Sequence, residues 1–143
     1  MSARAALVVG QIVFIDVPNE SAHPAVIVLD LGNGAYIVVN GTGSPQDEVA
    51  TVSLSEAVAK RCGLTKATSF YSSKKFVWYW RAPSHVEAVG SVLVSHLASL
   101  RAGAIATLNT MTSASGEVGK IPDGVGLSLS QIKLLSQTLK AVS

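Results

Sequence analysis

Two apolar runs separated by a short turn constrain the fold most. The runs "PAVIVLD" (residues 24–30) and "AYIVVN" (residues 35–40) have strand length and are rich in β-branched residues. The intervening "LGNG" offers residues that tolerate positive φ, as a tight hairpin requires. Because neither run alternates with polar residues, both strands are expected to be buried on both faces, in a small barrel or against a partner. Such a hairpin would bring His23 and residues 40–42 to the same edge of the sheet.

Other short segments also have strand character. They are residues 11–17, 49–54, 67–71 and 75–80. Five or six short strands joined by tight turns predict a β-rich α+β fold built on a small barrel or curled sheet. A short helix is expected over residues 55–62, with Gly63 as its C-terminal cap.

Two helices are expected after the strands. "SHVE" (residues 84–87) has the form of a capping box, but Gly90 interrupts the apolar periodicity, so the first helix begins either there or near Ser91. Its apolar face would hold Val86, Val89, Leu93, Leu97 and Leu100. Residues 109–127 have the composition of a loop, and residues 128–142 predict an amphipathic helix. We therefore expect a domain over residues 1–108, and a linker and helix over 109–143 that pack on the same domain.

The composition bears on surroundings and assembly. Hydrophobic residues make up 48% of the chain and charged residues 14%, against the roughly 25% charged residues of typical soluble domains. Apolar surface covered by a second copy would explain this, so a homodimer is expected. No apolar run approaches the 18–20 residues of a membrane helix. The lone Cys62 fits a reducing compartment, so we expect a cytoplasmic protein away from membranes.

Charge is distributed unevenly along the chain. Residues 5–59 contain no Lys or Arg and six acids, whereas residues 60–81 contain six basic residues and no acid. The six are Lys60, Arg61, Lys66, Lys74, Lys75 and Arg81. Such asymmetry is typical of a surface for polyanions, or of a solvated face whose charges pair with acids of the first half.

Few segments carry a recognisable chemistry. The chain has no glycine-rich phosphate loop, no zinc-ligand spacing and no closely spaced acid pair, so neither a metal nor a cofactor is expected. His85 and His96 would share a helix face without a third ligand nearby. The candidates that remain are the two ends of the hairpin and the basic segment.

The strand after Lys74 and Lys75 mixes aromatic and cationic groups. "FVWYW" is followed by Arg81, and unpaired bases stack on such rings while Lys and Arg bind the phosphates. Lys74, Lys75 and Arg81 are therefore candidate contacts to a nucleic-acid backbone. The aromatic residues are equally consistent with core or dimer contacts.

Five segments together resemble a known family. "GQIVFIDVP", "HPAVIVLD", "VVNGTGS", "CGLTKATSFYSSKKFV" and "VEAVGSVLVSHLASL" follow one another as in the MazF/PemK-like toxins of bacterial toxin–antitoxin pairs, over residues 10–108. The resemblance implies an SH3-like barrel with C-terminal helices, a homodimer, and a small antitoxin as partner. It also implies metal-independent cleavage of single-stranded RNA, in which the 2′-hydroxyl attacks the adjacent phosphate and leaves a cyclic phosphate.

The same resemblance implies site residues. The family's Thr at the end of the third strand falls on Thr42. Asn40 and Ser44 are close to it in this sequence and are candidate substrate contacts, without a counterpart in the family motif. The family's Arg, which precedes the Pro, falls on His23. Imidazole can exchange protons near neutral pH, but it holds a phosphate less firmly than a guanidinium does. Two hypotheses follow: an endoribonuclease that uses His23 and Thr42, or a catalytically inactive barrel that binds a protein or nucleic acid.

Overall fold

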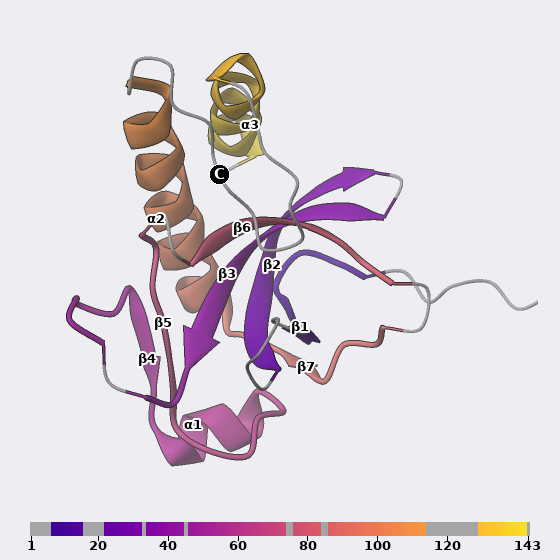
Figure 1. Cartoon of the computed structure of the whole chain (residues 1–143). Helices are drawn as coiled ribbons and strands as arrows, with labels where there is room; N and C mark the ends of the chain where they lie inside the picture. Colours follow the sequence, from indigo (N-terminus) through magenta and orange to yellow (C-terminus); the bar gives the residue numbers. More distant parts are fainter. Residues whose placement is uncertain are drawn as a thin grey trace, which may run out of the picture.

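The computed structural model describes residues 7–15, 22–32, 34–44, 46–73, 76–83, 86–113 and 129–142. Within these segments seven strands form one curled antiparallel sheet, in the order β4-β5-β3-β2-β1-β7, with β6 also paired to β3 (Figure 1). The strands are β1 Gln11–Ile15, β2 His23–Gly32, β3 Ala35–Thr42, β4 Val52–Leu54, β5 Thr68–Phe70, β6 Val77–Arg81 and β7 Gly90–Ser91. The helices are α1 Glu56–Arg61, α2 Val94–Ser113 and α3 Leu129–Val142. The prediction of a β-rich α+β fold with a curled sheet is confirmed.

The predicted hairpin is the centre of the sheet. β2 and β3 pair antiparallel from Ala25 opposite Asn40 to Gly32 opposite Ala35, with two irregularities in the register. Gly32 and Gly34 have φ of 84° and 79°, values that residues other than glycine rarely adopt. The turn residues thus allow the reversal that the sequence predicted.

Both faces of the hairpin are buried, as the uninterrupted apolar runs predicted. The larger core cluster contains Val26, Val28, Ile37 and Val39. Ile27 and Val38, which alternate with them along the strands, belong to a second cluster on the other face. Leu100, Ala104 and Leu108 of α2 belong to the first cluster. The second is completed by residues before β1 and after β6, namely Leu7, Val9, Ala82, Val86 and Ala88. The chain therefore covers both faces of its own central strands.

Helix α2 differs from the prediction at both ends. Residues 86–89 are not helical, because Val89 N–H donates to Ile12 O at 2.9 Å and leads into β7, which pairs with β1. The capping box proposed at residues 84–87 is therefore wrong where it is described, and the helix starts at Val94. Residues 109–113, expected to be linker, continue α2, and the remainder of the expected linker lies outside the described residues.

The predicted C-terminal helix is confirmed as α3. It packs against α2, and the two lie side by side in Figure 1. Leu139 of the predicted apolar stripe is fully buried in the core cluster with Leu100 and Leu108. No helix in the described segments is long and apolar enough to cross a membrane.

Two glycines bring the chain after α1 close to β7. Helix α1 is capped by Ser55 Oγ, which accepts from Val58 N at 3.3 Å, and it ends before Gly63, whose φ is 96°. A Cβ at Gly90 would lie 1.8 Å from Cys62 O, and a Cβ at Gly63 would lie 2.2 Å from Val89 O. Since no side chain fits there, the chain after α1 touches β7 backbone to backbone.

Candidate functional site

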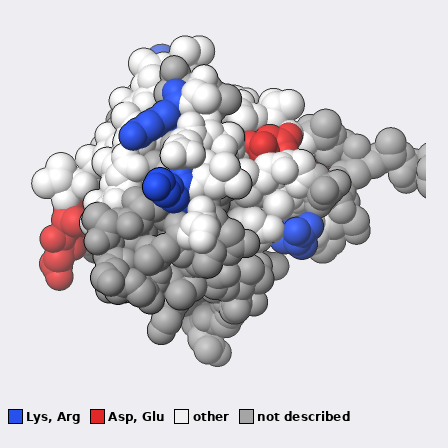
Figure 2. All heavy atoms as spheres, turned by 90° about the horizontal axis from the view of Figure 1, so that it is seen from above, with Lys and Arg blue, Asp and Glu red and all other residues white. Residues whose placement is uncertain are grey.

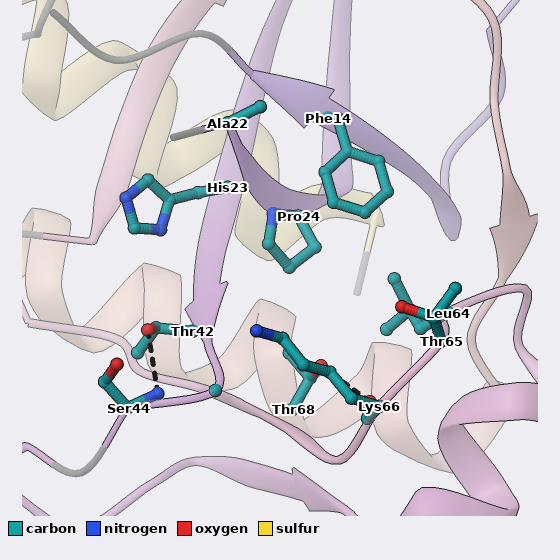
Figure 3. Close-up of a pocket in the computed structure, with 11 residues that line it drawn as sticks. Phe14, Ala22, His23, Pro24, Thr42, Ser44, Leu64, Thr65, Lys66 and Thr68 are labelled. Carbon is teal, nitrogen blue, oxygen red and sulfur yellow. Dashed lines mark hydrogen bonds between the residues drawn. The ribbon is translucent and has the colours of Figure 1, made fainter. Parts of the chain in front are cut away.

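A hollow of about 270 Å³ lies at the end of the sheet opposite the β2–β3 turn. It is bordered by residues from the start of β2, the end of β3, and the segment between α1 and β5 (Figure 3). The lining residues are Phe14, Ala22, His23, Pro24, Thr42, Gly43, Ser44, Leu64, Thr65, Lys66 and Thr68. Pockets for drug-sized ligands range over roughly 300–1,000 Å³. A space somewhat smaller than these suits a group such as one phosphate with its sugar.

One wall of the hollow comes from β1 and β2. The pairing of these strands sets Phe14 opposite Pro24 and Ile15 opposite His23. His23 is half-buried, whereas the Phe14 ring is 43% exposed although its neighbours Val13 and Ile15 are buried. Figure 3 shows the His23 imidazole and the Phe14 ring on either side of Pro24. This wall therefore offers one group that can exchange a proton and one open apolar surface.

The opposite wall contains the end of β3. Thr42 is 9% exposed, and its Oγ1 accepts a hydrogen bond from Ser44 N at 3.1 Å. Because the hydroxyl acts as acceptor in that bond, its own hydrogen remains to be donated to a ligand. The bond also fixes the position of Thr42 Oγ1 relative to the following loop. Ser44 itself is exposed at the rim.

Lys66 extends across the hollow from the segment that precedes β5. Its side chain runs toward Thr42 in Figure 3, and its Nζ lies 3.4 Å from the position that a Cβ at Gly43 would occupy. Lys66 O accepts from Thr68 Oγ1 at 3.0 Å. Lys66 belongs to the basic segment of the sequence, where it is not among the predicted site residues. Lys66 comes to the hollow because β5 pairs with β3, which sets Thr42 opposite Ser69. Only knowledge of that pairing would have identified Lys66 as a site residue.

The structure brings together three of the residues that the sequence singled out. His23, Thr42 and Ser44 all line this hollow, as the antiparallel hairpin predicted. Asn40 does not line it. Its side chain is 2% exposed, its Nδ2 donates to Phe76 O at 3.0 Å, and its Oδ1 is buried without a hydrogen-bond partner. Asn40 holds the chain at the point where β3 leaves β6 and meets β5.

Of the other candidate cations, the one that the structure describes does not lie at this edge. Arg81 is opposite Ala35, at the turn end of the hairpin, and its Nη2 donates to Tyr79 Oη at 3.1 Å. The remaining two candidates, Lys74 and Lys75, lie outside the described residues, as does His85. The aromatic strand β6 packs into the sheet, where Val77 and Trp80 are buried. Its rings therefore serve the core more than an open surface.

The basic segment does not form one patch where it is described. Lys60 Nζ pairs with Glu56 Oε1 at 3.3 Å on the exposed side of α1, while Lys66 and Arg81 lie at opposite ends of the sheet. Among the described residues on the face seen from above, Figure 2 shows a few Lys and Arg side chains on an otherwise mostly uncharged surface, with one of them apart from the others. Among the described residues, no group of three or more His, Cys, Asp or Glu side chains could hold a metal ion.

The hollow combines groups that complement a phosphodiester. It offers an imidazole, an ammonium, a hydroxyl donor and an open aromatic ring within one small space. Cleavage of RNA by its own 2′-hydroxyl needs a base, an acid and stabilisation of the extra negative charge on phosphorus.

The sequence has no match among models of known protein families and none among curated proteins.

Proposed function

We propose that this protein is a MazF/PemK-like endoribonuclease, an SH3-like barrel that cleaves single-stranded RNA without a metal ion or cofactor. The observation that carries the proposal is that His23 and Thr42, from different strands, border the same hollow as the Lys66 ammonium. The curled sheet and the C-terminal-side helices are compatible with that family's barrel. The proposed context is a cytoplasmic homodimer whose activity a small antitoxin protein neutralises.

The proposed reaction is an in-line displacement at phosphorus. The RNA 2′-hydroxyl loses its proton to a base and its oxygen bonds to phosphorus, while the bond from phosphorus to the 5′-oxygen breaks and that oxygen receives a proton. His23 is the base that takes the 2′-hydroxyl proton in this scheme, and a water molecule supplies the proton to the departing 5′-oxygen. Thr42 Oγ1 donates a hydrogen bond to a non-bridging oxygen, whose charge grows in the transition state. Ser44 contacts the neighbouring backbone.

A second candidate function is a binding module of the same architecture without catalysis. The observation that favours it is the identity of residue 23. Histidine stands where the family has an arginine, and only the arginine guanidinium can bind phosphate through a bidentate hydrogen bond. In that case RNA or a protein partner would occupy the same hollow and remain intact.

Purified protein and 5′-labelled single-stranded RNA test the proposal, in buffer with a chelator. We expect cleavage that leaves a 2′,3′-cyclic phosphate and that a single 2′-deoxy substitution at the cleaved position prevents. His23→Ala and Thr42→Ala are each expected to lower kcat/KM by about 10²-fold or more, a typical contribution of general acid–base or oxyanion stabilisation. Thr42→Ser keeps the hydroxyl and should retain most activity.

Thr138→Ala is the matched control, because Thr138 is an exposed threonine on α3 whose Oγ1 donates to Leu134 O at 2.9 Å. It should cleave as the unchanged protein does. RNA binding without cleavage would replace the nuclease by the binding module. Absence of both cleavage and binding would reject the RNA proposal altogether.

A further inference from the structure

The proposed chemistry requires a positive charge that residue 23 does not supply in permanent form. A phosphodiester carries one negative charge, and the phosphorane formed during cleavage carries a second. Histidine is charged only in part near neutral pH. A permanent cation within reach of Thr42 would therefore complete the hollow, and its source has to be found among neighbouring segments.

Lys66 is placed to be that cation. Its side chain reaches across the hollow toward Thr42 (Figure 3), and its Cε and Nζ would lie 3.1 and 3.4 Å from a Cβ at Gly43. The end of the Lys66 side chain therefore lies against Gly43. Glycine at this position leaves room for both the ammonium and a ligand.

The backbone around Lys66 is anchored while its side chain stays open to solvent. Leu64 is buried and its N–H donates to Ala59 O at 2.9 Å, and Thr68 Oγ1 donates to Lys66 O at 3.0 Å. Lys66 itself is exposed. A fixed backbone with a free ammonium limits the region in which the charge moves, which reduces the entropy lost when a phosphate binds.

No competing contact holds the Lys66 ammonium within the described parts of the chain, where no carboxylate pairs with it. Two other basic residues are engaged elsewhere. Lys60 pairs with Glu56, and Arg101 Nε donates to Val28 O at 3.1 Å. Lys66 thus differs from these two residues in both position and availability.

We propose that Lys66 is the phosphate-binding residue of this site, with the phosphodiester of single-stranded RNA as its ligand. The inference rests on the proposed function and names the residue that takes over the charge of the missing arginine. The ammonium contacts a non-bridging oxygen between Thr42 and His23. During cleavage Lys66 stays protonated and transfers no proton, while the 2′-oxygen bonds to phosphorus and the 5′-oxygen departs.

The first test measures the binding of a 2′-O-methylated, uncleavable RNA strand at several KCl concentrations. Each phosphate contact contributes about 0.7 to the slope of log K against log salt for a single strand. Lys66→Gln is expected to reduce that slope by about this amount and to weaken binding. Lys60→Gln removes an equal charge on exposed α1 and serves as the matched control.

Cleavage supplies a second readout with the same variants. Lys66→Gln should lower kcat/KM by about 10²-fold, whereas Lys66→Arg should recover part of the loss because it retains a cation. A Lys66→Gln protein with the salt slope and kcat/KM of Lys60→Gln would overturn the assignment and leave the proposed function standing.

Inorganic phosphate gives a test that does not depend on RNA cleavage. Backbone amide resonances of Gly43 and Ser44 are expected to shift during a phosphate titration of the unchanged protein, and this response should disappear in Lys66→Gln. Equal shifts in both proteins, or none in the unchanged protein, would overturn the role of Lys66. A response that depends on Lys66 in a protein that does not cleave RNA would contradict the nuclease and support the phosphate site.

Discussion

Phe14 is an aromatic residue exposed at the rim of the hollow, between two buried neighbours of β1. An open ring beside a phosphate site offers a surface on which one base can stack, and such stacking contributes about 1–3 kcal/mol per base. We therefore expect Phe14→Ala to weaken binding of uncleavable RNA by about that amount, measured by fluorescence anisotropy. Phe14→Leu keeps an apolar side chain without the aromatic face. Equal binding by Phe14→Leu and the unchanged protein would argue against stacking.

Asn40 is expected to act on stability. Its Nδ2 and its backbone N–H both donate to Phe76 O, at 3.0 and 2.8 Å, inside the protein. Asn40→Ala removes one of these bonds and should lower the free energy of unfolding by about 1–2 kcal/mol. Asn40→Asp should lower it further, because a carboxylate there would be buried beside a carbonyl oxygen. Urea denaturation measures both, and an unchanged midpoint for Asn40→Asp would contradict this role.

Sequence reasoning found the residues that local pairing brings together and missed those that depend on distant pairing. His23 and Thr42 face each other because one hairpin joins their strands, and a hairpin can be predicted from its turn. Lys66 reaches the hollow through the pairing of β5 with β3, which no turn in the sequence specifies. The prediction that Arg81 belongs to the site is wrong for the same reason, because the sequence does not show that β6 pairs with β3 and sets Arg81 at the turn end of the hairpin.

Among the elements, α3 is the one whose role in the fold is most directly testable. Leu139 on α3 is fully buried against α2, while Leu134 on the same helix is 63% exposed. Leu139→Ala should destabilise the protein by about 2–5 kcal/mol, as buried leucine truncations do. Leu134→Ala should stay within about 0.5 kcal/mol of the unchanged protein. Similar thermal unfolding of the two variants would mean that α3 does not contribute to the core.

Element types were predicted better than element ends. The strands of the hairpin and helix α3 follow from apolar runs and periodicity, and the structure contains them. The earlier of the two predicted starts of α2 is wrong because Val86 and Val89 fit a helical period but lie in extended chain that covers and borders the sheet, whereas the start near Ser91 is close to the observed Val94. β7 has only two residues, too few for any pattern, and its existence depends on the neighbouring β1.

At the scale of the whole molecule, exposed apolar residues gather beside the β1–β7 edge. Val8 precedes β1, Leu93 and Val94 follow β7, and Val92 N–H donates to Gly10 O at 2.9 Å between them. If the proposed homodimer uses this face, Val94→Asp should shift the protein toward monomer in sedimentation equilibrium. Val49→Asp, at an equally exposed valine before β4, is the matched control. Dimers that persist in Val94→Asp would exclude this face.

The order of the strands could not be derived from the sequence. β6 and β5 share β3 as a partner along different parts of its length, and the choice depends on which side chains fill each face once the sheet has curled. The core residues themselves were predictable, because continuous apolar runs imply burial on both faces. The local sequence therefore predicts that these residues are buried, but it does not predict which residues they contact.

The touching backbones of Gly63 and Gly90 imply that the site can be disturbed from a distance. Lys66 follows Gly63 by three residues, so we expect a displacement of Gly63 from β7 to shift the Lys66 backbone, and the ammonium with it, relative to Thr42. Gly90→Ala should lower phosphate affinity as well as stability, although residue 90 does not line the hollow. Once one methyl group has forced the segments apart, a second should cost less, so Gly63→Ala and Gly90→Ala are expected to be non-additive in a double-mutant cycle. The two glycines would then act as one structural unit, which together determines how far the Lys66 ammonium reaches toward Thr42.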